Sequence, residues 1–234
     1  MCVRVCARAS RDRIDESPTV TPHPTSLLQQ VLALWRYDKG SSNGAPFVYF
    51  GAEPRGCDTA ETRTLAEYAL RALDALGWRW GAAHLEIMAT PQGPRLVEAN
   101  VGRWNGLDFK LLADVCFGGN AFEATVHAYL DADAWAAIPT APGAAHCSGM
   151  LAVLCASVEG TYVGMRHADA LTQLSSLVAI EPAVAEGEPM RLTTDLDSAA
   201  GYAQLMHQDP AVVAAEYEEL RRLQPSLFVV AEEK

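Results

Sequence analysis

The sequence predicts an α+β fold with a mostly antiparallel sheet, flanking helices and a smaller C-terminal α+β subdomain. Two amphipathic segments with helix-capping residues, 58–77 and 209–223, predict helices. Short strand patterns joined by turn residues predict local hairpins at 85–97 and 150–165. Helices mixed with hairpins, without a regular strand–helix alternation, are typical of the α+β class.

Three parts are expected along the chain: a poorly ordered leader over residues 1–30, a first domain over 31–131 and a C-terminal subdomain over 146–234. The leader is rich in Arg, Ser, Thr and Pro and has no sustained hydrophobic period. Its first seven residues have the pattern of a short strand. A transit peptide is the alternative, but the apolar core of a secretory signal is missing and three early acids oppose a transit peptide: Asp12, Asp15 and Glu16.

The first domain is expected to begin with two strands and a helix. The strands are Val31–Tyr37 and Phe47–Phe50, and the loop 38–46 between them contains Asn43, Gly44 and Pro46, which form a turn more readily than a site. Asp58 and Glu61 have the spacing of a capping box, and Gly77 suits the position after a helix C-terminus. The helix should bury an apolar stripe of Leu65, Tyr68, Ala69, Ala72, Leu73 and Leu76.

The rest of the chain carries shorter elements. Helices are expected at 109–116, 120–130 and 168–176, a connector at 132–145, strands at 177–180 and 226–230, and a hairpin that pairs 150–157 with 161–165. Asp209 followed by Pro210 predicts the start of the last helix, because an acid caps the N-terminus and proline fits the first turn.

The composition is that of a globular protein that binds neither nucleic acid nor an anionic membrane. Of its 234 residues 50% are hydrophobic, and the net charge of −11 repels polyanions. No segment approaches the ~18 consecutive apolar residues of a membrane helix. The six cysteines have no metal-binding spacing and are expected to be buried thiols in a reducing, cytoplasmic compartment.

The segment 84–106 concentrates the polar chemistry. Alternation along a strand places His84 and Glu86 on one face, and likewise Glu98 and Asn100. Pairing around the intervening turn would bring Glu86 close to Glu98. Two carboxylates and an amide oxygen are hard donors that Mg²⁺ accepts, so Glu86, Glu98 and Asn100 are the candidate metal ligands.

Arg103 follows directly, where its guanidinium can brace a phosphate. The alternative for the whole segment is an ordinary edge hairpin with a hydrated polar face. Two aligned acids with little cationic compensation repel each other unless they are solvated or bind a cation, and this repulsion favours the metal site.

This segment resembles the metal-binding end of the ATP-grasp superfamily, whose last motifs are Gly-x-x-His-x-Glu, a short turn, Glu-x-Asn and an arginine. The matching positions are Gly81, His84, Glu86, Glu98, Asn100 and Arg103. The nearest branch is the amino-acid (dipeptide) ligases, which the segment 35–51 also resembles, and the resemblance runs from about Leu34 to the C-terminus. Arg103 stands five residues after Glu98 instead of the usual four. Either the loop carries an extra residue or Arg103 acts from a shifted position.

The resemblance implies an ATP-dependent carboxylate–amine ligase that uses ATP and Mg²⁺ (or Mn²⁺), with small-molecule amino acids as the expected substrates. In that family a carboxylate attacks the γ-phosphate and the acyl phosphate is captured by an amine. Glu86, Glu98 and Asn100 would hold the metal and its nucleotide, and Arg103 would be the catalytic residue that stabilises charge on the phosphoryl group. Lys39 is a candidate contact to a phosphate or a substrate carboxylate, with a solvated loop lysine as the alternative.

The resemblance also implies a first nucleotide-binding lobe that supplies two lysines, a glycine-rich flap and a hinge acid. The chain contains only three lysines, Lys39, Lys110 and Lys234, and no phosphate-binding glycine loop. It is therefore expected to lack that lobe. The alternatives to a working ligase are a non-catalytic regulatory or oligomerisation module and a fragment of a longer enzyme, and a homodimer is left open.

The other polar candidates have simpler expectations. Asn105 and Asp108 can position an acceptor amine or cap a helix, and Trp104 can wall a substrate pocket or pack at its rim. The histidines lack partners at ligand spacing, namely His127, His146, His167 and His207. No nucleophile elbow surrounds Ser148 or Ser157.

Overall fold

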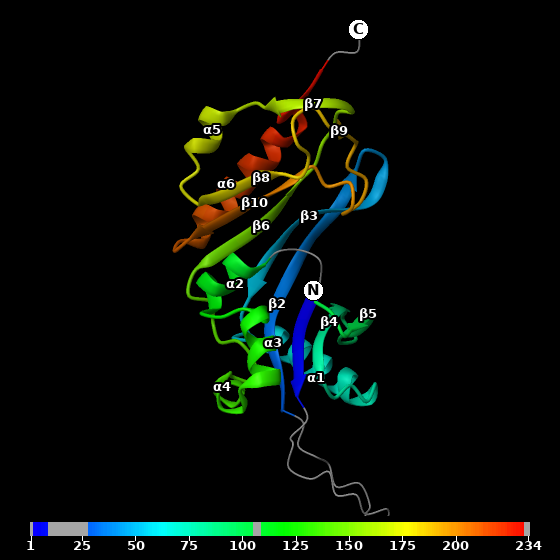
Figure 1. The fold of residues 1–234 in the computed structure, drawn as a ribbon, viewed down its shortest axis with the longest axis vertical. Coiled ribbons are helices and arrows are strands. Elements are labelled where there is room, and N and C mark those ends of the chain that lie inside the picture. Colours follow the sequence, from blue (N-terminus) through cyan, green and yellow to red (C-terminus); the bar gives the residue numbers. More distant parts are fainter. Residues whose placement is uncertain (1, 9–27, 105–108, 232–234) are drawn as a thin grey trace, which may run out of the picture. The chain divides into compact units, whose positions relative to one another are not determined.

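The computed structural model describes residues 2–8, 28–104 and 109–231 (Figure 1). It divides into two compact units, Met1–Trp35 with Arg55–Ala145, and Arg36–Pro54 with His146–Lys234. The described strand pairings are antiparallel. The predicted α+β class, with a mostly antiparallel sheet and flanking helices, is confirmed.

The first unit contains a sheet in the order β5-β4-β1-β2. Its strands are β1 (Cys2–Arg8), the first part of β2 (Leu28–Ser42), β4 (Gly81–Met88) and β5 (Arg95–Val101). Its helices are α1 (Ala60–Ala75), α2 (Lys110–Phe117), α3 (Ala121–Leu130) and α4 (Ala132–Ala137). Helix α4 occupies part of the stretch 132–145, where the sequence predicts only a connector.

The N-terminal strand differs from the expected leader over residues 1–30. β1 lies between β2 and β4 and pairs with both, and β2 already begins at Leu28. Two neighbouring strands bind the backbone of β1 on both sides, so pairing with distant segments defines a strand that its local sequence signals only weakly. Residues 9–27 lie outside the described part of the chain.

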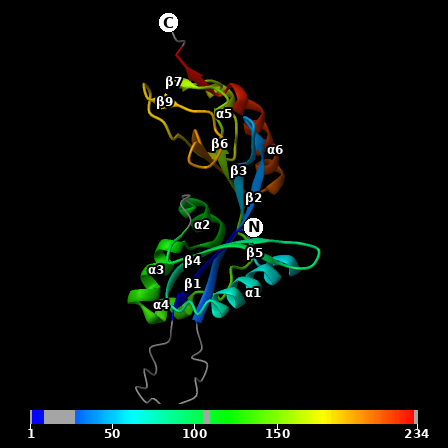
Figure 2. The ribbon, with the colours of Figure 1, turned by 90° about the vertical axis from the view of Figure 1, so that its right-hand side faces the viewer.

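Helices cover both faces of this sheet (Figure 2). Helix α1 packs on the face that carries Leu85 and Ile87, and forms a core with them through Leu65 and Leu73. Helix α3 lies on the other face, against β1 and β4. Since side chains alternate along β4, His84 lies on the α3 side of the sheet.

Helix α1 is capped one residue later than the sequence predicts. Thr59 is the N-cap and accepts a hydrogen bond from the Thr62 N–H at 3.1 Å, while the Thr62 hydroxyl accepts from the Thr59 N–H at 3.2 Å. The predicted box of Asp58 and Glu61 is therefore wrong, because two hydroxyls make the reciprocal bonds instead. Gly77 follows the helix with a φ of 68°, as predicted, but Leu76 is exposed rather than buried.

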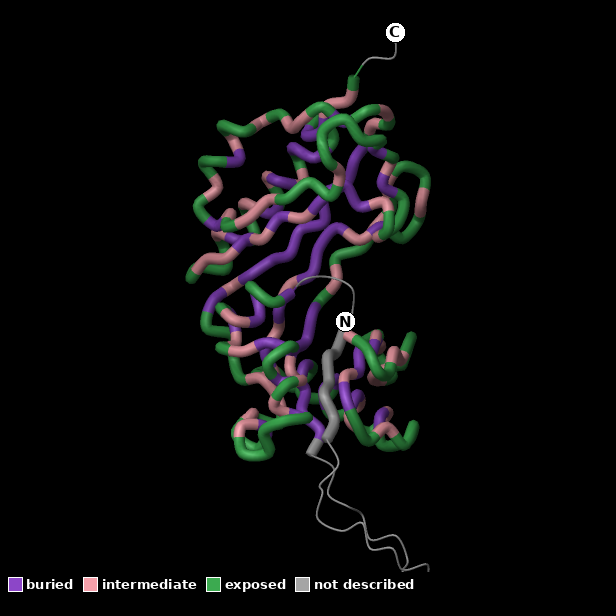
Figure 3. Tube along the Cα trace, viewed as in Figure 1, coloured by how far each residue is buried: buried purple, intermediate pink, exposed green. Residues whose placement is uncertain are grey.

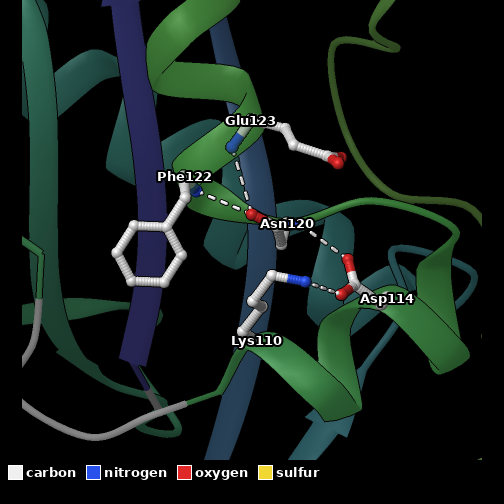
Figure 4. A network of polar contacts seen from close by, with 5 residues as sticks. All are labelled: Lys110, Asp114, Asn120, Phe122 and Glu123. Atoms are coloured by element: carbon white, nitrogen blue, oxygen red, sulfur yellow. Dashed lines mark hydrogen bonds and ion pairs between the residues drawn. The ribbon is translucent and has the colours of Figure 1, made fainter.

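A polar network holds α2 against the start of α3 (Figure 4). Asn120 caps α3 by accepting from the N–H groups of Phe122 and Glu123, and its amide donates to Asp114 at 2.7 Å. Lys110 forms an ion pair with the same carboxylate. Burial would raise the pKa of Asp114, but the hydrogen bonds from Lys110 and Asn120 outweigh it and lower the pKa.

The second unit contains residues 36–54 of the β2–β3 hairpin and two groups of strands. β3 (Ala45–Arg55), β6 (Ser148–Leu154), β10 (Gly201–His207) and β8 (Leu177–Pro182) follow each other in one sheet, and β11 (Phe228–Val230), β7 (Gly160–Met165) and β9 (Pro189–Met190) form another. The helices are α5 (Ala168–Thr172), α6 (Pro210–Leu223) and the 3₁₀ turn Gln224–Ser226. The sequence assigns residues 36–54 to the first domain, and the structure places them in this unit.

The predicted hairpin of residues 150–157 with 161–165 is wrong. β6 pairs with β10 and β3, whereas β7 pairs with β11 and β9. β6 is buried along almost its whole length (Figure 3), and distant strands pair with both of its edges. The start of α6 is as predicted, with Asp209 accepting from the Ala211 N–H and Pro210 in the first turn.

Among the described residues, no helix combines the length and the apolar character needed to cross a membrane.

Candidate functional site

The two candidate metal-binding acids lie directly opposite each other. Glu86 on β4 pairs with Glu98 on β5, and His84 pairs with Asn100 in the same register. Cross-strand partners share a face of the sheet, and their Cβ atoms are ~5 Å apart in such pairs. The predicted placement of Glu86 and Glu98 on adjacent antiparallel strands is confirmed.

The Asn100 side chain connects the Arg103 guanidinium to the Glu98 carboxylate. Its Oδ1 accepts from Arg103 at 2.7 Å, and its Nδ2 donates to Glu98 and lies 3.4 Å from His84 Nδ1. A guanidinium only donates and a carboxylate only accepts, so these two neighbours define which side of the amide faces each of them. Since the amide nitrogen can only donate, His84 Nδ1 is the acceptor in this contact.

Arg103 reaches the group through a turn at Gly102. The Gly102 N–H donates to the Ala82 carbonyl at 2.7 Å, one bond beyond the end of β5. Gly102 then has a φ of 86°, which favours glycine, and the chain turns so that the guanidinium meets Asn100. The two alternatives for the unusual spacing of Arg103 both stay open, because each is compatible with this hydrogen bond to Asn100.

A β-bulge follows the acidic pair. Glu86 pairs with Glu98 but Ile87 pairs with Leu96, so Val97 is the extra residue. The Leu96 N–H donates to the Tyr68 hydroxyl on α1 at 3.1 Å, which ties the bulge to the helix. Sequence reasoning did not find this contact, because a helix tyrosine and a strand amide 28 residues apart give no local signal.

Helix α3 supports the other end of the group. Trp104 donates its ring N–H to the Thr125 hydroxyl at 3.1 Å, so the residue next to Arg103 is attached to α3. His84 is buried at 6% exposure, whereas Glu98 and Arg103 are exposed. Glu98 and the guanidinium therefore remain accessible to a ligand, while Glu86 is half-buried.

The residues of the group fit a divalent cation. Among the described residues no three His, Cys, Asp or Glu side chains converge as a metal-binding group. This group has two acids, and its further hard donor is the Asn100 amide oxygen, which keeps a second lone pair beside the bond from Arg103. Mg²⁺ commonly takes one or two carboxylates and completes its shell with water and phosphate oxygens.

Lys39 belongs to the second unit, whereas the other candidates belong to the first. Its ammonium lies 4.0 Å from the ring centroid of Tyr49 and 5.0 Å from that of Tyr37. The candidates Asn105 and Asp108 lie outside the described residues.

The structure resembles solved enzymes over almost its whole length. It matches L-amino acid ligase from Bacillus licheniformis with a TM-score of 0.71 and 16% identity, over 99% of this chain and 54% of that one. It matches phosphoribosylglycinamide synthetase from Anaerococcus prevotii with a TM-score of 0.64 and 10% identity, over 98% and 53% of the two chains. It also matches a carboxyaminoimidazole ribonucleotide synthase from Aspergillus clavatus, crystallised with ATP. The TM-score is 0.55 and the identity 13%, over 95% of this chain and 50% of that one.

The chain has an ATP-grasp-like fold. This confirms the fold that the motifs around Glu86 and Glu98 predict. The ATP-grasp-like chain spans about half the length of these structures. No family model and no curated protein sequence matches it.

Proposed function

We propose that this ATP-grasp-like chain carries the metal-binding side of an ATP-dependent carboxylate–amine ligase site, with amino acids as substrates. The observation that carries the proposal is the direct pairing of Glu86 with Glu98, linked through Asn100 to Arg103. Two like charges directly opposite each other repel, and a cation bound between Glu86 and Glu98 would relieve this repulsion. The fold shared with an L-amino acid ligase and with a synthase crystallised with ATP supports the same class of reaction.

Each residue then has a distinct role. Glu86, Glu98 and the Asn100 oxygen would hold Mg²⁺ or Mn²⁺, and a bound metal ion supplies the positive charge that an acidic surface needs to accept phosphate oxygens. Arg103 would bind a phosphate oxygen and stabilise charge there without proton transfer, because a guanidinium keeps its protons. His84 would maintain the orientation of the Asn100 amide.

The metal site is tested by titrating the full chain with Mn²⁺ by calorimetry. Glu98→Gln should weaken Mn²⁺ binding at least tenfold, because it removes one of two charged ligands. Glu67→Gln is the matched control: Glu67 is exposed on α1, which covers the opposite face of the sheet. Equal losses in both variants would show only general attraction of cations to an acidic protein.

The melting temperature without metal gives a second result. Glu98→Gln should leave it unchanged or raise stability by ~0.5 kcal/mol, because repulsion between paired acids is relieved and a glutamine oxygen still accepts from Asn100. A clear fall in the melting temperature of the metal-free variant would instead identify Glu98 as a structural hydrogen-bond acceptor and would contradict the metal site.

A further inference from the structure

The second unit contains an anionic cavity of about 570 Å³ that the proposed function does not use. Residues of β2, β3, β6 and α6 line it. Its ionisable side chains other than tyrosine are three acids, Asp38, Glu53 and Glu218, and one base, Arg36. The described lining therefore has a net negative charge, which attracts cations.

Two of the acids are left to attract a ligand. Arg36 and Glu53 form an ion pair at 2.6 Å, so these two charges compensate each other. Asp38 and Glu218 lie on different elements, β2 and α6, and both are exposed towards solvent. Both line the same cavity, so a ligand ammonium there has two carboxylates in the lining as acceptors.

Tyr217 holds Asp38 in place. Its hydroxyl donates to Asp38 Oδ2 at 2.7 Å, and the tyrosine is only 5% exposed. Burial, and then the hydrogen bond to Asp38, raise the pKa of Tyr217, so the hydroxyl remains a donor at neutral pH. A Cβ atom at Gly51 would lie 2.9 Å from this hydroxyl, so glycine leaves the room that Tyr217 needs. A carboxylate accepts several hydrogen bonds, and Asp38 retains lone pairs for a ligand.

The remaining walls suit a short hydrocarbon chain. Met150 and Val213 line the cavity and belong to the buried core of the unit. The lining thus combines charged groups with an apolar part, which matches a small organic molecule that carries both a charge and a hydrocarbon chain.

We propose that this cavity binds a small primary amine in its ammonium form, with the ammonium at Asp38 and Glu218 and a short apolar chain against Met150 and Val213. This proposal does not depend on the metal site of the first unit.

The test uses the full chain, ¹⁵N-labelled, and n-butylammonium chloride as the probe in an NMR titration. Saturable shifts are expected for amides of α6 and of β2 around Asp38. 1-Butanol has the same chain without the charge and should bind at least tenfold more weakly. Equal binding of both compounds would overturn the proposal, and so would displacement of butylammonium by an equal concentration of Mg²⁺.

Two variants and a control locate the ammonium. Asp38→Asn and Glu218→Gln should each weaken butylammonium binding at least fivefold. Glu159→Gln removes the same charge from an exposed position in the same unit, outside the cavity lining, and should leave binding unchanged. Asp38→Asn can disturb Tyr217, which donates to Asp38. Glu218 is exposed, so Glu218→Gln should leave the fold intact and still tests the binding of the ammonium. Unchanged binding in Glu218→Gln, or an equal loss in Glu159→Gln, would overturn the proposal.

Discussion

Asn100 illustrates how a single residue organises the candidate metal site. Its amide separates Arg103 from Glu98 and still contacts both, so charge is distributed without a direct ion pair that would occupy the carboxylate. The sequence motif predicts Asn100 as a ligand. It does not predict the contact with Arg103, because that contact depends on the positive φ of Gly102.

At the same scale, the Cys57 thiol should be unreactive at neutral pH. Burial, and then the charge of Asp58, raise its pKa from 9.0 to about 11. At a pH below both values, the thiolate fraction of Cys57 is ~100-fold smaller in the native protein than in the unfolded chain. Alkylation by iodoacetamide at pH 8 should therefore be slower in the native protein by about that factor. Peptide mapping after timed labelling, with a control in 6 M guanidinium chloride, measures the two rates.

The raised pKa of Cys57 also affects stability. The native state holds this proton more tightly than the unfolded chain does. The protonated thiol therefore contributes to the free energy of unfolding fully below pH 9, and this contribution is lost as the pH rises towards 11. Equal labelling rates in the native and unfolded chain would contradict the burial of this thiol.

At the scale of elements, the β2–β3 hairpin depends on Asn43 and Gly44. Both have positive φ, 49° and 81°, as a two-residue hairpin turn requires. The Asn43 amide also donates to the carbonyls of Ala156 and Thr193, at 2.9 and 2.8 Å. Asn43→Ala should destabilise the second unit by about 2 kcal/mol, because two carbonyls lose their donor and a Cβ remains in a left-handed conformation.

Asn43→Gly separates the two causes, since it relieves the backbone and still removes the amide. The stability of the second unit in Asn43→Gly should lie between that of the native protein and that of Asn43→Ala. All five tryptophans belong to the first unit, so their fluorescence does not report this change directly. Hydrogen exchange of the β10 amides measures it, and equal protection in all three proteins would show that the side-chain bonds contribute nothing.

These elements also show which parts of the fold the sequence encodes locally. The helix start at Asp209 was predictable, because it depends on residues within one turn of chain. The short turn of the β4–β5 hairpin likewise made the pairing of Glu86 with Glu98 predictable. The expected loop 38–46 contains the turn at Asn43 and Gly44, but its predicted bounds are wrong: β2 continues to Ser42 and β3 begins at Ala45, because pairing between the two strands extends them up to the turn. The insertion of β1 between β2 and β4, and the partners of β6, depend on pairing between distant segments and have no local signature.

At the scale of the whole molecule, the distribution of cations limits nucleotide binding. The chain has three lysines, and two of them already have neighbours: Lys110 pairs with Asp114, and Lys39 lies over aromatic rings in the second unit. Arg103 is hydrogen-bonded within the acidic group. Phosphate affinity comes mainly from charge-assisted bonds to such cations.

We therefore expect residues 1–234 to bind ATP weakly, with a Kd in the millimolar range, and only when Mg²⁺ or Mn²⁺ is present. Calorimetry with a non-hydrolysable ATP analogue measures this, and Arg103→Ala should remove the remaining affinity while leaving Mn²⁺ binding within twofold. ADP formation with a panel of amino acids should be undetectable for this chain alone. Robust ADP formation that Glu98→Gln abolishes would show that the chain itself supplies the phosphate-binding groups that its few lysines do not account for.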